Sequence, residues 1–214
     1  MIHLISAKKA RGILRRYADW IETLSKRYRV PSAAIKAILY QEMIQIDLLD
    51  PLVDLVVLTG LFPKKDSSTG FAQIFGYVGL NAVNFAVDHG LATYESLGFS
   101  VGHRLDSTNP RDVRMVWLRL RRNTHANIEI ATLNILAVAD EMTGRIDFST
   151  FSEEELQLVF TRYNANVHYV TAYGRQAYRN YLEFKDEEEA ERRIDPRQAC
   201  ARSSKTRATR QALR

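Results

Sequence analysis

The chain has 214 residues, 46% of them hydrophobic and 26% charged, and a formal net charge of +5. This length supports one well-packed domain, and the single cysteine, Cys200, excludes a disulfide framework and a cysteine-based zinc site. Six basic residues and no acidic ones fall in 196–214, so residues 1–195 are nearly neutral and the charge is a poor argument that the fold binds nucleic acid.

The first part of the chain predicts two helices followed by less regular segments. An amphipathic helix is expected over Ser6–Tyr28 and a second helix over Val30–Ile46. The apolar run 52–62 is compatible with a short helix or another buried segment, and 63–70 has the composition of a loop. Two glycines in 71–79 indicate a helix entry or an irregular stretch.

The second part of the chain predicts helices with clear start signals. Asn109-Pro110 begins one helix, with an asparagine cap and a proline at the first helical position. Residues 128–142 are apolar on nearly every face, which is typical of a central buried helix, and Gly144 is placed to end it. Ser152 begins a capping box for the next helix, and a last helix rich in tyrosine is expected over about 169–184.

These elements predict a mainly α fold with little or no β-structure around the buried central helix, because the sequence shows no convincing strand alternation. One domain is expected over 1–185. Residues 186–214 begin with DEEEAERR and continue as a charged, basic tail, which predicts fraying helix followed by disorder. The N-terminal segment lacks the apolar run of a secretory signal, and no segment has the length and hydropathy of a transmembrane helix.

The helix over Val30–Ile46 carries a glutamate on its apolar side. Pro31 and Ser32 supply start signals, and Glu42 lies near the middle of an apolar stripe that covers about 140° of the helix surface. An unpaired buried carboxylate is costly and tends to stay protonated, and a carboxyl group that is neutral near pH 7 suits a general acid. The structural alternative is that Glu42 pairs with one of the many arginines. The stripe consists of Ile35, Ile38, Leu39, Met43 and Ile46.

Three segments follow one another along the chain: the helix that carries Glu42, the run 70–73 (GFAQ) and the run 163–165 (YNA). Together they resemble the lysozyme-like superfamily of soluble lytic transglycosylases and goose-type lysozymes. The pattern of that family is a glutamate late in a proline-started helix, then a G-L-M-Q segment and then an A-Y-N-A-G segment. Met43 and Asn166 stand where the family usually has serine and glycine, which implies a divergent branch.

The resemblance implies a lysozyme-like helical domain and assigns roles to its site residues. Glu42 would be the general acid, Tyr163 could donate its hydroxyl to Glu42, and Asn164 could hold a substrate amide. The structural alternatives are a core position for the tyrosine and a helix C-cap for the asparagine. The residues that would line the groove and contact N-acetyl groups or a water are Ser67, Ser68 and Gln73, of which the glutamine could equally be a surface residue.

The identity of a second carboxylate decides the reaction. Inverting glycosidases need a base about 6.5–9.5 Å from the acid, and retaining ones need a nucleophile at about 5–5.5 Å. Asp66 is the candidate, because goose-type lysozymes similarly have an aspartate just before their G-F, although Asp66 could equally begin the Ser/Thr turn. Asp47 and Asp50 are further options. Lytic transglycosylases use the N-acetyl and 6-hydroxyl groups of the substrate instead, so the sequence leaves hydrolysis and transglycosylation open.

The resemblance therefore implies a muramidase that cleaves the β-1,4 bond between N-acetylmuramic acid and N-acetylglucosamine in peptidoglycan. No metal or other cofactor is expected, because His125 and Glu129 lack a second histidine at the spacing of a zinc motif. Without a signal peptide, the enzyme would be made in the cytoplasm and delivered to the cell wall by another system. A delivery machine and an immunity or inhibitor protein are then the expected partners besides the glycan strand. The alternative class is a non-catalytic helical binding module for nucleic acid or another acidic polymer.

Overall fold

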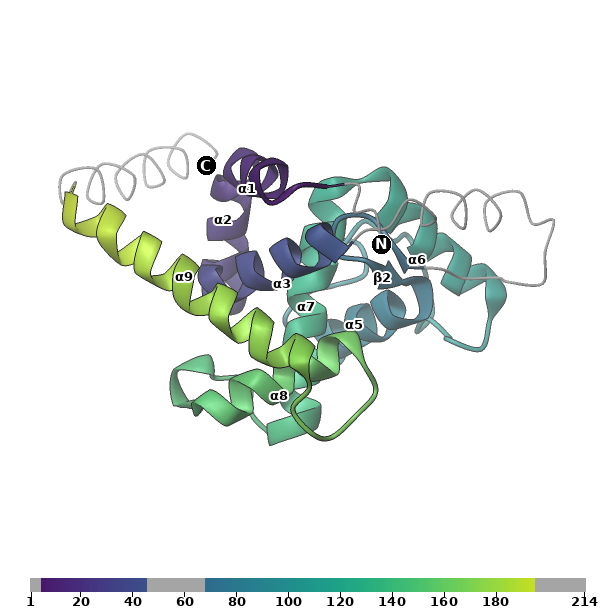
Figure 1. Cartoon of the computed structure of the whole chain (residues 1–214). Helices are drawn as coiled ribbons and strands as arrows, with labels where there is room; N and C mark the ends of the chain where they lie inside the picture. The colour runs from purple at the N-terminus through teal and green to yellow at the C-terminus, as the bar shows by residue number, and fades with distance from the viewer. Residues whose placement is uncertain (1–4, 46–67, 195–214) are drawn as a thin grey trace, which may run out of the picture.

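The computed structural model describes residues 5–45 and 68–194, and these are mainly helical, as the sequence predicts (Figure 1). The strands described form one small antiparallel sheet, in which Ser68 pairs with Phe75 and Thr69 with Ile74. Within these two ranges, no helix is both long enough and apolar enough to cross a bilayer. The elements in chain order are α1 (Ala7–Arg16), α2 (Ala18–Tyr28), α3 (Ser32–Gln45), β1 (Ser68–Thr69), β2 (Ile74–Phe75), α5 (Gly76–Asp88), α6 (Pro110–Arg122), α7 (Thr124–Thr143), the 3-10 helix η1 (Phe148–Thr150), α8 (Glu153–Asn164) and α9 (Ala172–Ile194).

The central helix predicted from 128–142 is α7, and this prediction is confirmed. It packs against α2, α3, α5, α6 and α8, and 13 of its 20 residues are buried (Figure 1). The Asn123 side chain accepts a hydrogen bond from the N–H of Ala126 and so caps its first turn. Gly144 ends it with a φ of 66°, a left-handed conformation that glycine adopts without steric cost.

The second helix, α3, lies deeper in the protein than its sequence pattern indicates. The predicted apolar stripe covers only part of the buried surface of this helix, because α1, α2, α7 and α9 surround the helix and bury it on nearly all sides. Gln41, which lies outside the stripe, is buried and accepts a hydrogen bond of 2.8 Å from Nδ2 of Asn180 in α9. The wall of the protein that holds Glu42 is therefore built by an inner helix.

The segment Ser6–Tyr28, predicted as one continuous helix, forms two helices, α1 and α2, so the prediction of a single helix was wrong. The break lies at Tyr17, whose ring packs edge-on against His125 with the centroids 5.3 Å apart. His125 also lies edge-on to Trp20, whose Nε1 donates a hydrogen bond of 3.1 Å to the His125 carbonyl. The break thus brings two aromatic side chains onto the start of α7, a tertiary contact that local periodicity does not report.

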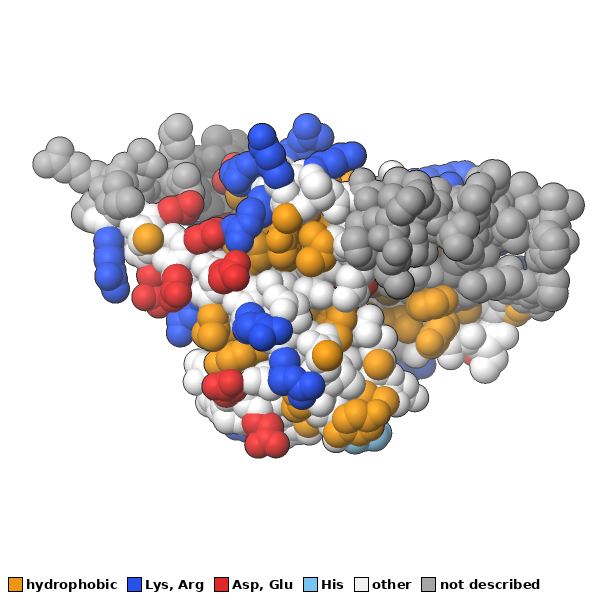
Figure 2. Space-filling view, viewed as in Figure 1, with side chains coloured by type: hydrophobic (Ala, Val, Ile, Leu, Met, Phe, Trp, Pro, Cys, Tyr) orange, Lys and Arg blue, Asp and Glu red, His pale blue; other side chains and the backbone are white. Residues whose placement is uncertain are grey.

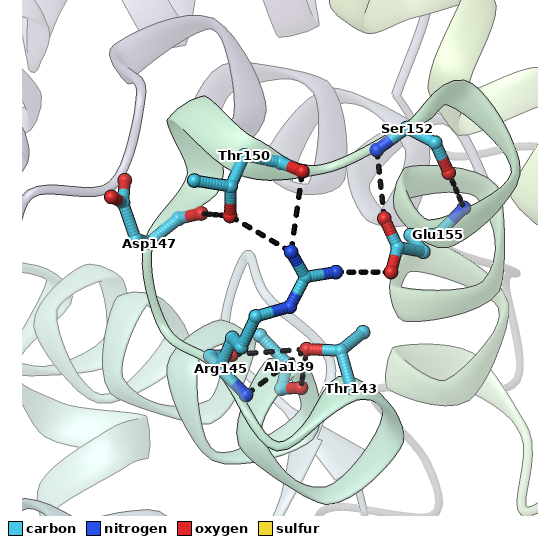
Figure 3. A network of polar contacts seen from close by, with 7 residues as sticks. All are labelled: Ala139, Thr143, Arg145, Asp147, Thr150, Ser152 and Glu155. Carbon is cyan, nitrogen blue, oxygen red and sulfur yellow. Dashed lines mark hydrogen bonds and ion pairs between the residues drawn. The ribbon is translucent and has the colours of Figure 1, made fainter.

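The start of α8 is fixed by a network of polar contacts around Arg145 (Figure 3). The predicted capping box is present: Ser152 and Glu155 each accept a hydrogen bond from the backbone N–H of the other residue. Arg145 donates to the Thr150 hydroxyl at 3.1 Å and forms an ion pair with Glu155. The turn between α7 and α8 is therefore held at both ends, which fixes the direction in which α8 leaves the central helix.

The last helix, α9, begins at Ala172 and continues without interruption through the predicted domain boundary at 185 to Ile194. Its residues there contact the N-terminal helices: Glu188 accepts hydrogen bonds from Ser32 at 2.5 Å and from Lys36 at 2.7 Å. Arg11 of α1 pairs with two further glutamates of α9. Figure 2 shows the corresponding charges, with acidic side chains along α9 and basic ones over α1. Residues 186–194 thus belong to the described helical structure, while 195–214 lie outside the described residues.

The crossing of α8 and α9 leaves no room for a side chain at Gly174. A Cβ atom there would lie 2.0 Å from Oγ1 of Thr161 and 2.3 Å from the backbone oxygen of Gln157. We therefore expect Gly174→Ala to lower the free energy of unfolding by about 1–3 kcal/mol, because the helices must separate. Urea unfolding monitored by circular dichroism measures this. The control is Gly12→Ala in α1, where nothing lies within 4 Å of a Cβ, so no loss is expected.

Candidate active site

A cavity of about 460 Å³ lies between the end of α3, the small sheet, α5, α7 and the end of α8. The sequence-predicted site residues that line it together are Glu42, Ser68, Gln73, Tyr163 and Asn164. These residues come from three segments that are far apart in the sequence, so the structure brings them together through the fold. The other two predicted site residues, Asp66 and Ser67, lie outside the described residues, as do the alternatives Asp47 and Asp50 and the apolar run 52–62.

Glu42 is the buried carboxyl group of this cavity, with 6% of its surface exposed. Burial raises its pKa from 4.5 to about 7, and a hydrogen bond donated by the Tyr173 hydroxyl opposes this rise in part. Among residues 5–45 and 68–194, no basic side chain forms an ion pair with Glu42. A carboxyl group with this pKa is in large part protonated near neutral pH, which is the state that a general acid requires.

A second buried glutamate, Glu129 in α7, shows what an ion-paired carboxylate looks like in the same protein. Its Oε1 accepts hydrogen bonds from Arg27 at 3.0 Å and from the Tyr28 hydroxyl at 2.7 Å. Glu129 does not line the cavity. Glu129 is therefore the buried glutamate that has an arginine partner, as the structural alternative proposed for Glu42. Among the described residues, Glu42 instead accepts a hydrogen bond from a tyrosine hydroxyl.

The tyrosine that donates to Glu42 is Tyr173 and not Tyr163, so the predicted contact of Tyr163 was wrong. The Tyr163 hydroxyl instead donates to the backbone oxygen of Ala72 at 3.1 Å, which ties α8 to the turn of the small sheet. Burial, followed by the charge of Glu42, raises the pKa of both tyrosines well above 10, so both hydroxyls keep their protons. One signal of Tyr173 is visible in the sequence, namely the tyrosine-rich last helix.

We expect Tyr173→Phe to shift the pH dependence of activity toward higher pH. The hydrogen bond from Tyr173 lowers the pKa of Glu42, so its removal should raise that pKa further above its ordinary value. The rate at pH 6 should fall by roughly tenfold, because the carboxyl group is less well oriented. A pH–rate profile of cell-wall clearing measures both effects. Tyr163→Phe is the matched control, and an equal shift in both variants would contradict the assignment.

The turn that carries Gln73 is held against the central helix by Asn127. The Asn127 side chain donates to the Thr69 carbonyl at 3.2 Å and accepts from the N–H of Ala72 at 3.0 Å. Gly70, with a φ of 73°, passes so close that a Cβ atom would lie 2.3 Å from Nδ2 of Asn127. The GFAQ segment predicted as a site element thus forms a rigid turn between β1 and β2, partly because a glycine permits the close approach.

Gln73 itself is oriented by contacts within this turn. Its Nε2 donates to the Gly70 carbonyl at 3.0 Å, and its Oε1 accepts from the Ser68 hydroxyl at 3.0 Å. Its φ of 44° is unusual for a residue other than glycine and marks a constrained backbone at the cavity wall. Ser68 and Gln73 therefore form one polar unit, which presents its remaining hydrogen-bonding capacity to the cavity.

Several cavity residues were not predicted from the sequence. Glu141 at the end of α7 and Arg162 in α8 form an ion pair of 2.8 Å, with Nε of the arginine also donating at 3.2 Å. Glu141 is thus a second carboxylate in the same cavity as Glu42. No motif marks these positions, because they meet only when α7 and α8 pack together. The other cavity residues that were missed include Gln45, Phe75, Tyr77, Asn81 and Asn134.

The described residues contain no group of three histidine, cysteine, aspartate or glutamate side chains arranged to hold a metal ion. Comparison of the chain with protein-family models, with curated proteins and with solved structures finds no match. The chemistry of the site is therefore argued from its own residues.

Proposed function

We propose that this protein is a muramidase that cleaves the β-1,4 bond between N-acetylmuramic acid and N-acetylglucosamine in peptidoglycan. The observation that carries the proposal is Glu42, a buried carboxyl group with a pKa of about 7 in the wall of a cavity of about 460 Å³. Cleavage of a glycosidic bond needs an acid that is still protonated at the pH of the reaction, since the leaving sugar oxygen must receive a proton.

The hydrogen bond from Tyr173 supports this role for Glu42. The tyrosine hydroxyl occupies Oε1, so the proton of the neutral carboxyl group belongs on Oε2. In the proposed reaction Glu42 gives that proton to the glycosidic oxygen as the bond to the anomeric carbon breaks. The positive charge that develops on the sugar ring is then relieved by water in hydrolysis, or by the 6-hydroxyl group of the same sugar in transglycosylation.

The polar residues around Glu42 support a substrate with amide groups. Asn164 and the Ser68–Gln73 unit offer hydrogen-bond donors and acceptors that suit N-acetyl groups, and Asn134 adds a further amide on the opposite helix. Tyr163 acts in this proposal as a positioning residue for the turn, since its hydroxyl bonds the Ala72 carbonyl. Ser67 is likewise proposed to line the groove and to contact an N-acetyl group or a water.

Two carboxylates compete for the role of base or nucleophile. Asp66 is proposed from the resemblance to goose-type lysozymes, and Glu141 is proposed because it lines the cavity. If the reaction is hydrolysis, one of these two carboxylates acts as the base or nucleophile. Of the variants Asp66→Asn and Glu141→Gln, the one that removes this carboxylate should then lower the rate by about 10²-fold or more, and the other variant should not. If it is transglycosylation, neither should do so. Rates of wall clearing by the two variants, compared with the native protein, distinguish these cases.

The products of the reaction test the proposal and decide its type. Purified peptidoglycan digested with the native protein should give soluble fragments that end in N-acetylmuramic acid, and mass spectrometry distinguishes reducing ends from 1,6-anhydro ends. Fragments cut on the other side of the muramic acid, or cut in the peptides, would overturn the proposed bond. Absence of soluble fragments would favour the alternative of a non-catalytic helical binding module for an acidic polymer.

The proposed substrate lies in the cell wall, so the proposal includes delivery of the protein by another system to the periplasm or the outside of a cell. A delivery machine and an immunity or inhibitor protein are the partners that this would require. Addition of purified protein to intact cells and to isolated walls measures the need for delivery, because only isolated walls should clear.

A further inference from the structure

Two buried amides join the helix that carries Glu42 to the helix that carries Tyr173. Nδ2 of Asn180 in α9 donates a hydrogen bond of 2.8 Å to Oε1 of Gln41 in α3, and both side chains are buried. Figure 1 shows α9 lying along α3, and the two helices pack directly against each other. Separating a buried amide pair leaves polar atoms without partners, so this bond favours one arrangement of the two helices.

The amide pair lies next to the contact between Glu42 and Tyr173. Gln41 directly precedes Glu42 in α3, and Asn180 follows Tyr173 by about two turns of α9. Residues at that spacing lie on nearly the same face of a helix, so both α9 side chains can reach α3. Each of them bonds one of two neighbouring residues of α3.

The amide of Asn180 is itself oriented by its own helix. Its Oδ1 accepts a hydrogen bond of 3.2 Å from Nε2 of Gln176, whose Oε1 in turn accepts one of 2.6 Å from Arg179. Because Oδ1 has this partner, Nδ2 of Asn180 is the group that is presented to Gln41. The pair therefore has one preferred arrangement, in which α9 donates and α3 accepts.

Contacts with α8 hold the start of α9, whereas the amide pair holds α9 on α3. The N–H of Thr171, just before α9, donates to Oγ1 of Thr161 in α8 at 3.1 Å. Apart from the bond that Tyr173 itself donates, the described hydrogen bond between α3 and α9 that lies nearest to it along the chain is that of Gln41 with Asn180. Tyr173 thus lies between two anchors, of which the amide pair is the one that joins α9 to α3.

We propose that Gln41 and Asn180 are positioning residues, whose hydrogen bond sets the place of α9 on α3 at which the Tyr173 hydroxyl reaches Glu42. This inference rests on the proposed function only for the reaction that Glu42 would serve. Neither amide lines the cavity, so the pair acts through Tyr173 and not on a substrate. Without the pair, the hydroxyl should leave Glu42, and the pKa of this carboxyl group should rise further because burial then acts unopposed.

The test measures the pKa of Glu42 directly in the full chain, so it does not require that the protein cleaves a substrate. Carbon NMR follows the chemical shift of the Glu42 carboxyl group from about pH 4 to about pH 10, and Glu42→Gln identifies its signal. In Gln41→Leu/Asn180→Leu, the pKa should rise above the native value of about 7, toward the value in Tyr173→Phe. The double substitution removes both partners together, so neither amide is left unpaired and the fold should be retained.

Two further variants separate positioning from a merely structural role. The exchanged pair Gln41→Asn/Asn180→Gln keeps one amide on each helix, so it should retain the native pKa. Asn84→Leu is the matched control, because Asn84 is a buried amide of α5 that bonds the Tyr94 hydroxyl. It should lower the free energy of unfolding without moving the pKa of Glu42. If the leucine variant does not fold, Asn180→Ala, which adds no volume to the core, takes its place.

A double-mutant cycle shows whether the pair acts through Tyr173. Adding Tyr173→Phe to the leucine variant should raise the pKa of Glu42 less than adding it to the native protein, because the hydroxyl has already left. An unchanged or lower pKa in the folded leucine variant, or additive effects in the cycle, would overturn the inference and leave the muramidase proposal intact. The expected rise in a protein that does not clear cell walls would support the positioning role and reject the enzyme.

Discussion

The substitution Glu42→Gln is expected to lower the rate of cell-wall clearing by about 10²–10⁴-fold while the protein stays folded. Glutamine has the shape of a protonated glutamate, and its Oε1 can still accept the hydrogen bond from Tyr173. It cannot give a proton to the glycosidic oxygen. A turbidity assay on purified cell walls, with circular dichroism to verify folding, measures the loss. Clearing at the native rate by a folded Glu42→Gln variant would reject the proposed acid.

The matched control for this variant is Glu129→Gln, because Glu129 is the other buried glutamate among residues 5–45 and 68–194. The substitution removes the negative charge of Glu129, which leaves Arg27 without its carboxylate partner and weakens the hydrogen bond from Tyr28. We expect a lower free energy of unfolding, by about 1–3 kcal/mol, with little change in the rate of the remaining folded protein. The pair of variants therefore separates a carboxyl group that serves chemistry from one that serves structure.

The activity is expected to decrease about tenfold per pH unit above pH 7, since Glu42 must be protonated and its pKa is about 7.

The same pKa has a consequence for stability. It lies above the ordinary value of 4.5, so between these two pH values Glu42 holds its proton in the folded protein more than in the unfolded chain. The stabilisation is fully present below pH 4.5, decreases as the pH rises, and is lost above pH 7, by about 3 kcal/mol in total.

The measurement that isolates this effect compares native protein with Glu42→Gln in urea unfolding at pH 5 and pH 8. Other carboxylates, such as Asp106, whose pKa the Thr108 hydrogen bonds lower, titrate in both proteins and cancel in the difference. The native protein should lose more stability than the variant between the two pH values. An equal loss in both would show that Glu42 ionises without cost, which contradicts the rise in its pKa that burial causes.

Local signals in the sequence predicted the parts of the fold that local physics determines. The cap at Asn109, the capping box at Ser152 and the helix end at Gly144 depend on residues within one turn of one another, and all three are confirmed. The central helix was predictable because a helix that is apolar all round must be enclosed by others. The unusual position of Glu42 followed from helical spacing alone.

The sequence could not predict the contacts that packing creates between distant segments. Tyr173 reaches Glu42 from 131 residues away, and Glu141 meets Arg162 only where α7 and α8 pack together. The break at Tyr17 likewise coincides with a ring contact to His125, which no periodicity in 6–28 reveals. The predicted Tyr163 contact was wrong for the same reason, since two tyrosines ten residues apart lie near Glu42 on different helices, and only Tyr173 donates to it.

The hydrogen bonds of Glu188 reveal how far the scaffold of Glu42 extends along the chain. Ser32 and Lys36 in the first half of α3 both donate to this one carboxylate, which lies beyond position 185. A protein shortened at that position would leave both donors without their acceptor and would loosen the helix whose far end bears Glu42. An expression clone of the folded helical unit should therefore extend at least to Ile194.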